Sequence, residues 1–169
     1  MTRRLDGYSS LMDLLAHYVR IHLTGASAGI ELFSRGPGLD DPKARQITAD
    51  IRGELFEERS WLRGFAREIG ASEPLLVETV AKIGERVGRL KPNGSLLHRT
   101  PLTDVIDLET MHDAVSGKVA GWEALLQFDD PRADKAELER LLAQGHSQLE
   151  RLRDRHRAAA KRAWESRRA

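Results

Sequence analysis

The segment that decides the fold runs from Asp40 to Gly70 and reads DDPKARQITADIRGELFEERSWLRGFAREIG. Its apolar residues recur every three or four positions, a spacing that places them along one side of an α-helix. They are Ile47, Ile51, Leu55, Leu62, Phe65 and Ile69. Asp40 or Asp41 can cap the start of this helix before Pro42, and Gly70 can end it. The segment therefore predicts one amphipathic helix over residues 41–70.

The same spacing recurs along most of the chain, and the alternation typical of strands is absent. It predicts further helices over residues 9–35, 74–88, 104–128 and 133–166. The first of them is expected to bury Leu11, Leu14, Leu15, Tyr18, Ile21 and Leu32. Asp104 follows Pro101 and is the expected N-cap of the helix at 104–128.

Two turn signals divide the four long helices into hairpins. Gly36-Pro37-Gly38 separates the first pair, and Asp129-Asp130-Pro131 separates the second. The connection between the hairpins holds the shorter helix and a loop over 91–103, so it can return the chain from one end of a bundle to the other. The sequence therefore predicts a single all-α domain over residues 1–169. Its expected architecture is a ferritin-like four-helix bundle, with two antiparallel hairpins joined by a long crossover that contains a short helix.

The composition excludes several classes of protein. The chain has 169 residues, of which 40% are hydrophobic and 31% charged, enough apolar material for one core. It has no cysteine, which excludes disulfides, thiol catalysis and cysteine zinc sites. No run approaches the ~20 apolar residues of a membrane span. The residues after Met1 do not form a secretory segment, so we expect a cytoplasmic protein.

Basic residues concentrate at the C-terminal end. Residues Arg151 to Ala169 contain eight Lys or Arg against Asp154 and Glu165, whereas the rest of the chain has a net negative charge. Such a segment can bind nucleic acid or anionic lipid, and it can equally complement the dipole at the end of a helix. Trp164 is its one aromatic residue, which favours the second interpretation.

Three predicted helices carry glycines four residues apart, at Gly25/Gly29, Gly84/Gly88 and Gly117/Gly121. Each glycine in a helix interior costs roughly 1 kcal/mol relative to alanine, so some other interaction must offset it. A glycine pair leaves a flat patch that another backbone can approach closely. We expect the crossover helix to pack there, and the alternative is a niche that is open to a flat ligand.

Several segments carry a resemblance to a known family. Residues 56–61 (FEERSW) are similar to the Glu-Glu-x-x-His segment of ferritin-like di-iron proteins. Residues 22–33 (HLTGASAGIELF) and 87–94 (VGRLKPNG) resemble a group of uncharacterised bacterial helical proteins placed near the ferritins. The resemblance covers most of the chain. It implies a bacterial branch of the ferritin-like superfamily with incomplete di-iron ligands.

A ferritin-like di-iron site takes one Glu from each of two helices and a Glu-x-x-His pair from each of the other two. This chain departs from that pattern. Glu58 lies on the predicted inner side of its helix, but Trp61 stands at the position of the histidine. Glu109 and His112 form a Glu-x-x-His pair on a helix where a lone Glu is expected.

On the last helix a carboxylate is missing, because Ala143 stands three residues before His146. Residue levels in the two hairpins still allow an inner polar cluster, and its candidate metal ligands are Glu58, His112, His146, His22 and Tyr18. The cluster has too few carboxylates for two iron ions. We therefore expect no catalytic residue and no cofactor, with iron or another divalent metal as the alternative. Glu58 is then a buried carboxylate that is hydrogen-bonded to Tyr18 or a histidine.

Three functional hypotheses follow. The first is a non-catalytic bundle with an interaction or structural role, which forms a homo-oligomer, expected to be a dimer. The second is a metal-binding protein or oxidative enzyme that uses the reduced inner polar site. The third is a protein that binds nucleic acid or anionic lipid through Arg151–Ala169.

Overall fold

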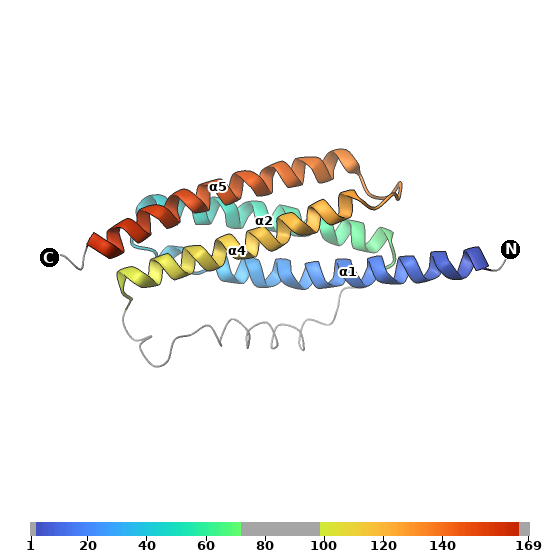
Figure 1. Ribbon diagram of the computed structural model, residues 1–169, viewed down its shortest axis with the longest axis horizontal. Helices are drawn as coiled ribbons and strands as arrows, with labels where there is room; N and C mark the ends of the chain where they lie inside the picture. Colours follow the sequence, from blue (N-terminus) through green and yellow to red (C-terminus); the bar gives the residue numbers. More distant parts are fainter. Residues whose placement is uncertain (1–2, 72–98, 166–169) are drawn as a thin grey trace.

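The computed structural model describes residues 3–71 and 99–165, and nearly all of them are helical. Four long helices lie side by side along a common axis (Figure 1). They are α1 (Arg3–Phe33), α2 (Pro42–Glu68), α4 (Pro101–Leu126) and α5 (Lys135–Glu165), and a short 3-10 helix, η1 (Gly36–Gly38), joins the first two. No strand occurs among the described residues, which confirms the all-α class for that part of the chain.

The helices form two antiparallel hairpins, α1 with α2 and α4 with α5 (Figure 1). Each helix packs against two others, because α1 and α5 both contact α2 and α4. Helices α2 and α4 begin at the same end of the bundle, so the end of α2 and the start of α4 lie at opposite ends of it. The helix predicted at 74–88 and most of the loop predicted at 91–103 lie outside the described residues.

The ends of α2 agree with the sequence. Asp41 is the N-cap, and its Oδ1 accepts a hydrogen bond from the Lys43 backbone N–H at 2.9 Å. Gly70 has a φ of +73°, a backbone conformation that is costly for residues with a Cβ. This turn lets the Ala71 N–H reach the Ala66 carbonyl at 2.8 Å and closes the helix.

The start of α4 differs from the prediction. The helix begins at Pro101 with Thr100 as N-cap, and the Thr100 N–H donates to Thr103 Oγ1 at 3.0 Å. Proline suits the first helical position because its φ is already helical and it has no N–H to satisfy. Asp104, the expected cap, is instead a buried acceptor for the Asp40 N–H and for Arg99 Nη2, both at 2.8 Å.

The predicted inner side of α1 is wrong in part. Leu11, Leu14 and Ile21 are 48%, 64% and 54% exposed. Helix α1 carries apolar residues on two adjacent sides, so the spacing alone could not decide which side faces the core. Within residues 11–33 of α1, the buried residues are Leu15, Ala16, Val19, Leu23, Thr24, Ile30, Leu32 and Phe33.

The hydrophobic core consists of two clusters along the bundle axis. One contains Phe33, Ile51 and Leu108, and the other contains Val19 and Phe65. The inner positions between these clusters are polar, and they are contributed by α2, α4 and α5. Among the described helices, none is long and apolar enough to cross a membrane.

Candidate functional site

The polar layer is defined here as Glu54, Glu58, Lys118, Gln148 and Arg151, and it lies between the two apolar clusters. Glu58 is at its centre. This residue is only 2% exposed and follows Leu55 and precedes Leu62 on the buried side of α2. A carboxylate in such a position must find hydrogen-bond donors or a cation.

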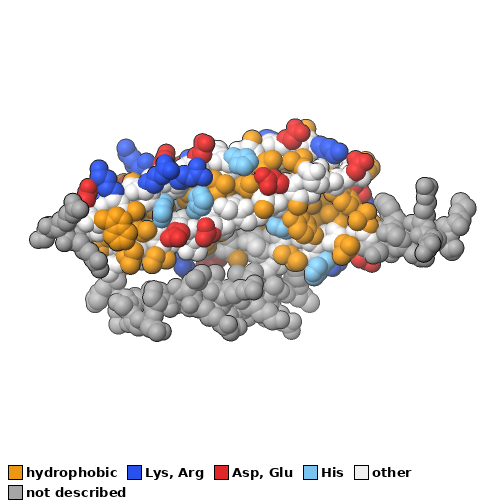
Figure 2. Space-filling view, viewed as in Figure 1, with side chains coloured by type: hydrophobic (Ala, Val, Ile, Leu, Met, Phe, Trp, Pro, Cys, Tyr) orange, Lys and Arg blue, Asp and Glu red, His pale blue; other side chains and the backbone are white. Residues whose placement is uncertain are grey.

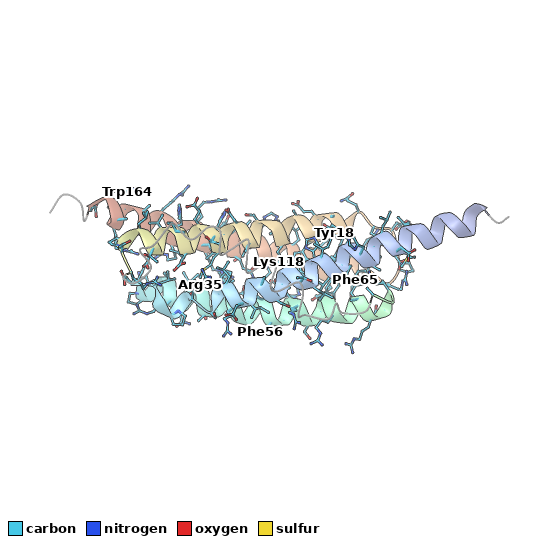
Figure 3. The ribbon with its side chains drawn as sticks, turned by 90° about the horizontal axis from the view of Figure 1, so that it is seen from below. Tyr18, Arg35, Phe56, Phe65, Lys118 and Trp164 are labelled. Atoms are coloured by element: carbon cyan, nitrogen blue, oxygen red, sulfur yellow. The ribbon has the colours of Figure 1, made fainter. Side chains whose placement is uncertain are left out.

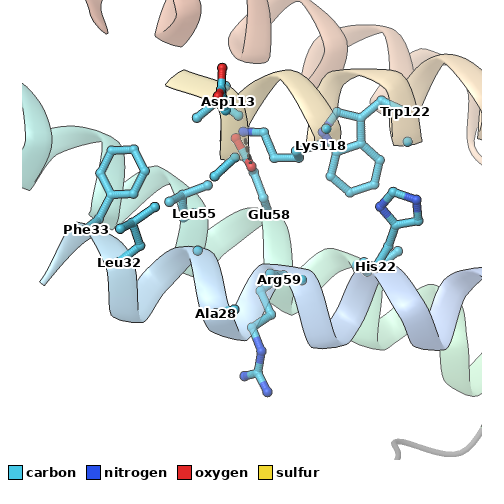
Figure 4. A pocket seen from close by; sticks show the side chains of 18 of the residues that line it. His22, Ala28, Leu32, Phe33, Leu55, Glu58, Arg59, Asp113, Lys118 and Trp122 are labelled. Atoms are coloured by element: carbon cyan, nitrogen blue, oxygen red, sulfur yellow. Dashed lines mark hydrogen bonds and ion pairs between the residues drawn. The ribbon is translucent and has the colours of Figure 1, made fainter. Parts of the chain in front are cut away.

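Lys118 supplies the cation. Its Nζ lies 2.5 Å from Glu58 Oε2 and also donates to Gln148 Oε1. The lysine side chain is 16% exposed and reaches Glu58 from the facing helix α4 (Figure 4). Figure 3 shows Lys118 at mid-length of the bundle, whereas Phe56 and Trp164 project from its outer sides. The interior therefore holds a direct ion pair between α2 and α4.

Gln148 connects this ion pair to a second one. It is fully buried on α5, and its Nε2 donates to Glu58 Oε1 at 2.8 Å and to Glu54 Oε2 at 2.7 Å. Arg151 Nη2 lies 2.9 and 2.7 Å from the two oxygens of Glu54. Each carboxylate thus has its own cation, and the amide of Gln148 bridges the two pairs.

The pKa values follow from this arrangement. Burial lowers the pKa of Lys118, and the neighbouring charge of Glu58 opposes this effect only in part. Burial by itself would raise the pKa of Glu54, but the hydrogen bonds from Arg151 and Gln148 outweigh it and lower that pKa. The layer is therefore arranged around an ionised Glu54.

The five candidate metal ligands do not form one cluster. Glu58 is buried as expected, but its partners are Lys118, Gln148 and Gln144 rather than Tyr18 or a histidine. Among the described residues, no three His, Asp or Glu side chains are grouped so that they could hold a metal ion.

His146, one of the candidate ligands for an inner polar cluster, is exposed, so it does not belong to the interior. The buried residues of α5 include Leu138, Leu141, Gly145, Gln148 and Leu152. Position 146 follows Gly145 directly and is therefore turned about 100° away from the buried side. Ala143, which stands where the resemblance implies a carboxylate, is exposed as well, so this position does not face the interior either.

The histidines of α1 and α4 also lie apart from Glu58's hydrogen bonds. His22 packs on Tyr18, with ring centroids 4.5 Å apart, and burial lowers its pKa. His112 is half-buried with Nδ1 3.8 Å from Asp113, and the exposed Glu109 lies 3.9 Å from His156.

Trp61 stands at the position where the resemblance implies a histidine, and it is half-buried. Its ring stacks on Phe65 and meets the edge of Trp122, both at centroid distances of 5.7 Å. Trp61 therefore belongs to the aromatic packing beside the polar layer and contributes no ligand atom to it.

The basic C-terminal region is part of the bundle as far as Glu165. Leu152, Ala159 and Ala163 are buried in α5. Arg155 and Arg162 lie 3.7 and 3.4 Å from the Asp41 carboxylate at the start of α2. Lys and Arg gather over this end of α5 on the face in Figure 2.

Sequence reasoning missed Lys118 and Gln148, although the sequence contains a signal for both. Position 118 continues the series 108, 111, 115, 122, 125, and position 148 continues 138, 141, 145, 152. Residues at such alternating steps of three and four face the core of a bundle. A charged or amide side chain in that series predicts a buried polar partner for Glu58.

A pocket of about 730 Å³ opens between α1 and α4, next to the polar layer. Glu58 and Lys118 lie in its wall, together with His22 and Trp122 (Figure 4). Arg59 also lines it, but its guanidinium points away from Glu58 and donates to Ser27 Oγ at 3.0 Å. Most of the remaining lining is apolar or glycine.

Comparison of the chain with models of protein families, with curated proteins and with solved structures finds no match in any of the three.

Proposed function

We propose that this chain is a ferritin-like helical bundle with a non-catalytic interaction or structural role. One observation carries the proposal. The Glu58 carboxylate, which the resemblance implies as a metal ligand, is bound at 2.5 Å by the Lys118 ammonium group. The bundle then uses an internal cation where a metalloprotein of this architecture uses a metal.

The charge balance of the polar layer supports this proposal. The two carboxylates, Glu54 and Glu58, are matched by Arg151 and Lys118. A divalent ion would have to displace Lys118 and would then find two carboxylates where a di-iron site of this type has four. Removing one partner from such a buried pair leaves an uncompensated charge, which opposes the exchange.

The topology supports the ferritin-like part of the proposal. Two antiparallel hairpins whose second and third long helices start at the same end require one long connection, as in ferritin-like bundles. The resemblance of residues 22–33 and 56–61 points in the same direction.

Metal analysis tests the proposal. Protein is purified without chelators, incubated with Fe²⁺, Mn²⁺ or Zn²⁺ in turn, dialysed and measured for metal per chain. We expect no stoichiometric metal in the wild type. One or two equivalents that disappear in Glu58→Leu would overturn the proposal. His146→Ala is the control, because metal lost only in that variant is bound at the exposed histidine.

A further inference from the structure

The end of α2 and the start of α4 lie at opposite ends of the bundle, and residues 72–98 join them in the sequence (Figure 1). Helices α2 and α4 occupy diagonal positions, because each of them packs mainly against α1 and α5. A segment that joins them can therefore pass along α1 or along α5. The surfaces of the described helices decide between these two routes.

The outward side of α5 does not suit an apolar segment. Its exposed side chains include Arg140, Glu150, Asp154 and Lys161. Among the described residues of α5, Trp164 near the C-terminal end is the one large hydrophobic side chain that is exposed. A segment packed on this side would take charged groups out of water and would bury little apolar surface. The route along α5 is therefore unfavourable.

The groove between α1 and α4 carries uncovered apolar surface. The pocket of about 730 Å³ lies in it, and most of the lining is apolar or glycine. Ile106 in its wall is 37% exposed, and Leu102, one turn earlier on α4, is 46% exposed. A groove of this kind fits the apolar side of an amphipathic helix, which the sequence predicts over 74–88. The apolar residues of that predicted helix are Leu75, Leu76, Val80, Ile83 and Val87.

Contacts between α1 and α2 give the level at which α2 ends. Arg59 Nε donates to Ser27 Oγ at 3.0 Å, and Arg52 Nε donates to the Ile30 carbonyl at 3.4 Å. Because the two helices are antiparallel and rise equally, Ala71 lies at the level of about residue 13 of α1. The groove extends from that level to the end of α1.

Contacts between α1 and α4 give the level of Gly117. His22 faces Gly121, because a Cβ added to Gly121 would collide with the His22 ring. This contact places Gly117 at about the level of Gly25. A Cβ added at Gly25, Gly29 or Gly117 would meet no described atom within 4 Å, so both walls of the groove are open at this level.

The glycines of the joining segment fall at the same level. A helix that starts at Pro74, beside about residue 15 of α1, and runs parallel to α1 has the same rise per residue. Gly84 and Gly88 then lie opposite Gly25 and Gly29. Glycines on facing helices let the two backbones approach closely. Such packing offsets the cost of placing glycine within a helix.

The charges of the groove and of the segment are complementary. Glu109 and Asp113 are exposed acidic residues of the α4 wall. From position 85 on, the segment has one acidic residue and three Lys or Arg residues, which are Arg86, Arg89 and Lys91. In the same register Arg89 lies at about the level of Asp113. Basic side chains of the segment can therefore pair with the acidic wall.

We propose that the groove between α1 and α4 is the docking surface for this chain's own residues 74–88, which lie in it as a helix parallel to α1, with Gly84 between Gly25 and Gly117. The inference goes beyond the proposed function, because it concerns what covers the groove and does not depend on the charges of the polar layer. Apolar surface remains at Leu14, near the level at which the segment begins, for the dimer expected from the sequence.

Disulfide formation between introduced cysteines tests the location, because the chain has no cysteine of its own. A disulfide requires Cα atoms within about 7 Å of each other. Under mild oxidation, Gly25→Cys with Gly84→Cys should form a disulfide within one chain, seen as a faster band of monomer mass on a nonreducing gel. Gly25→Cys with Arg86→Cys is the matched control, because two helical positions turn the side chain about 200° away from the groove.

His146→Cys with Gly84→Cys tests the route along α5. His146 is exposed and lies on α5 near the level of Lys118, which hydrogen-bonds Gln148. This pair should stay reduced. A disulfide in this pair, equal disulfide formation by the Arg86→Cys control, or no disulfide within the Gly25→Cys, Gly84→Cys chain would overturn the inference. A disulfide between two chains of that variant would also overturn it, because a second copy would then fill the groove.

Filling the groove tests the same docking without cysteines. Gly117→Leu places a bulky side chain in the groove. Tryptic cleavage after Lys82 and Arg86 should become about tenfold faster or more, because proteases cut segments that open locally. Gly53→Leu is the matched control, because position 53 is an exposed glycine of α2 with no described atom within 4 Å of an added Cβ. Cleavage confined to the segment shows that the bundle itself is folded. Equal cleavage rates in the wild type and both variants would contradict the docking.

Discussion

At the scale of single residues, the sequence predicted the burial of Glu58 but not its partner. The helical spacing of α2 places Glu58 between Leu55 and Leu62, and the structure buries it there. Its partner comes from α4, 60 positions along the chain, and a pairing at this distance depends on how the two hairpins are rotated against each other. His112 and His146, two candidate ligands suggested by the resemblance, are not at the inner positions. A lysine in the interior is not expected from the sequence, because lysines are seldom buried.

At the α4–α5 turn, a single carboxylate predicts how the stability of the protein depends on pH. Hydrogen bonds and the charge of Arg132 lower the pKa of Asp130 from 3.8 to about 2, with burial acting in the opposite direction. A lowered carboxyl pKa adds stability above pH 4, and this contribution is lost as the pH falls through about 2. Asp130→Asn should therefore destabilise the protein at pH 7, by on the order of 1 kcal/mol after screening by solvent.

Urea unfolding at pH 7 and pH 2 checks this prediction. The difference between the wild type and Asp130→Asn should shrink at the lower pH. Asp129→Asn is the control, because the Asp129 side chain is 98% exposed and its substitution should change little at either pH. An equal effect of Asp130→Asn at both pH values would contradict the role given to Arg132.

At the scale of the elements, local sequence signals predict the ends of α2 correctly. They predict less accurately which sides of α1 and α5 are buried. Asp41, Pro42 and Gly70 mark the ends of α2, because capping and φ preferences act within a few residues. Which side of a helix faces inward depends on its neighbours. Leu14 of α1 and His146 of α5 are both exposed although each lies directly beside a buried residue, Leu15 and Gly145.

Two substitutions of Asp41 separate its role as the cap of α2 from its ion pairs with α5. The Asp41 carboxylate caps α2 and also lies within 4 Å of Arg155 and Arg162. Asp41→Ala removes both roles, and we expect a loss of stability of about 1–2 kcal/mol. Asp41→Asn keeps a capping oxygen, so it should cost less than half as much. Thermal unfolding compares the two variants, and equal losses would mean that the cap contributes nothing.

At the scale of the whole molecule, the all-α class was predictable because helical periodicity runs through the long segments that the structure describes. The division of the core into two apolar clusters was not predictable in the same way. It depends on Glu58, Lys118 and Gln148 reaching the same level on three helices. That level follows from the lengths of the turns and the relative heights of the hairpins.

The expected homodimer stays a prediction at this scale. Leu14 and Ile21 are 64% and 54% exposed on one side of α1, which leaves apolar surface for a second copy to cover. Sedimentation equilibrium should give a dimer for the wild type. Leu14→Glu with Ile21→Glu should shift it to the monomer, whereas Phe56→Glu on the outer side of α2 should not. A wild-type monomer at all concentrations would contradict the prediction.

The central claim is that Lys118 and Glu58 neutralise each other in the interior, and a double-mutant cycle tests it most directly. Free energies of unfolding are measured by urea for the wild type, Glu58→Leu, Lys118→Met and the double variant. Each single change should cost about 3–5 kcal/mol, because it leaves one buried charge without its partner. The double variant should be close to the wild type in stability. Additive losses, or a Lys118→Met variant as stable as the wild type, would contradict the account.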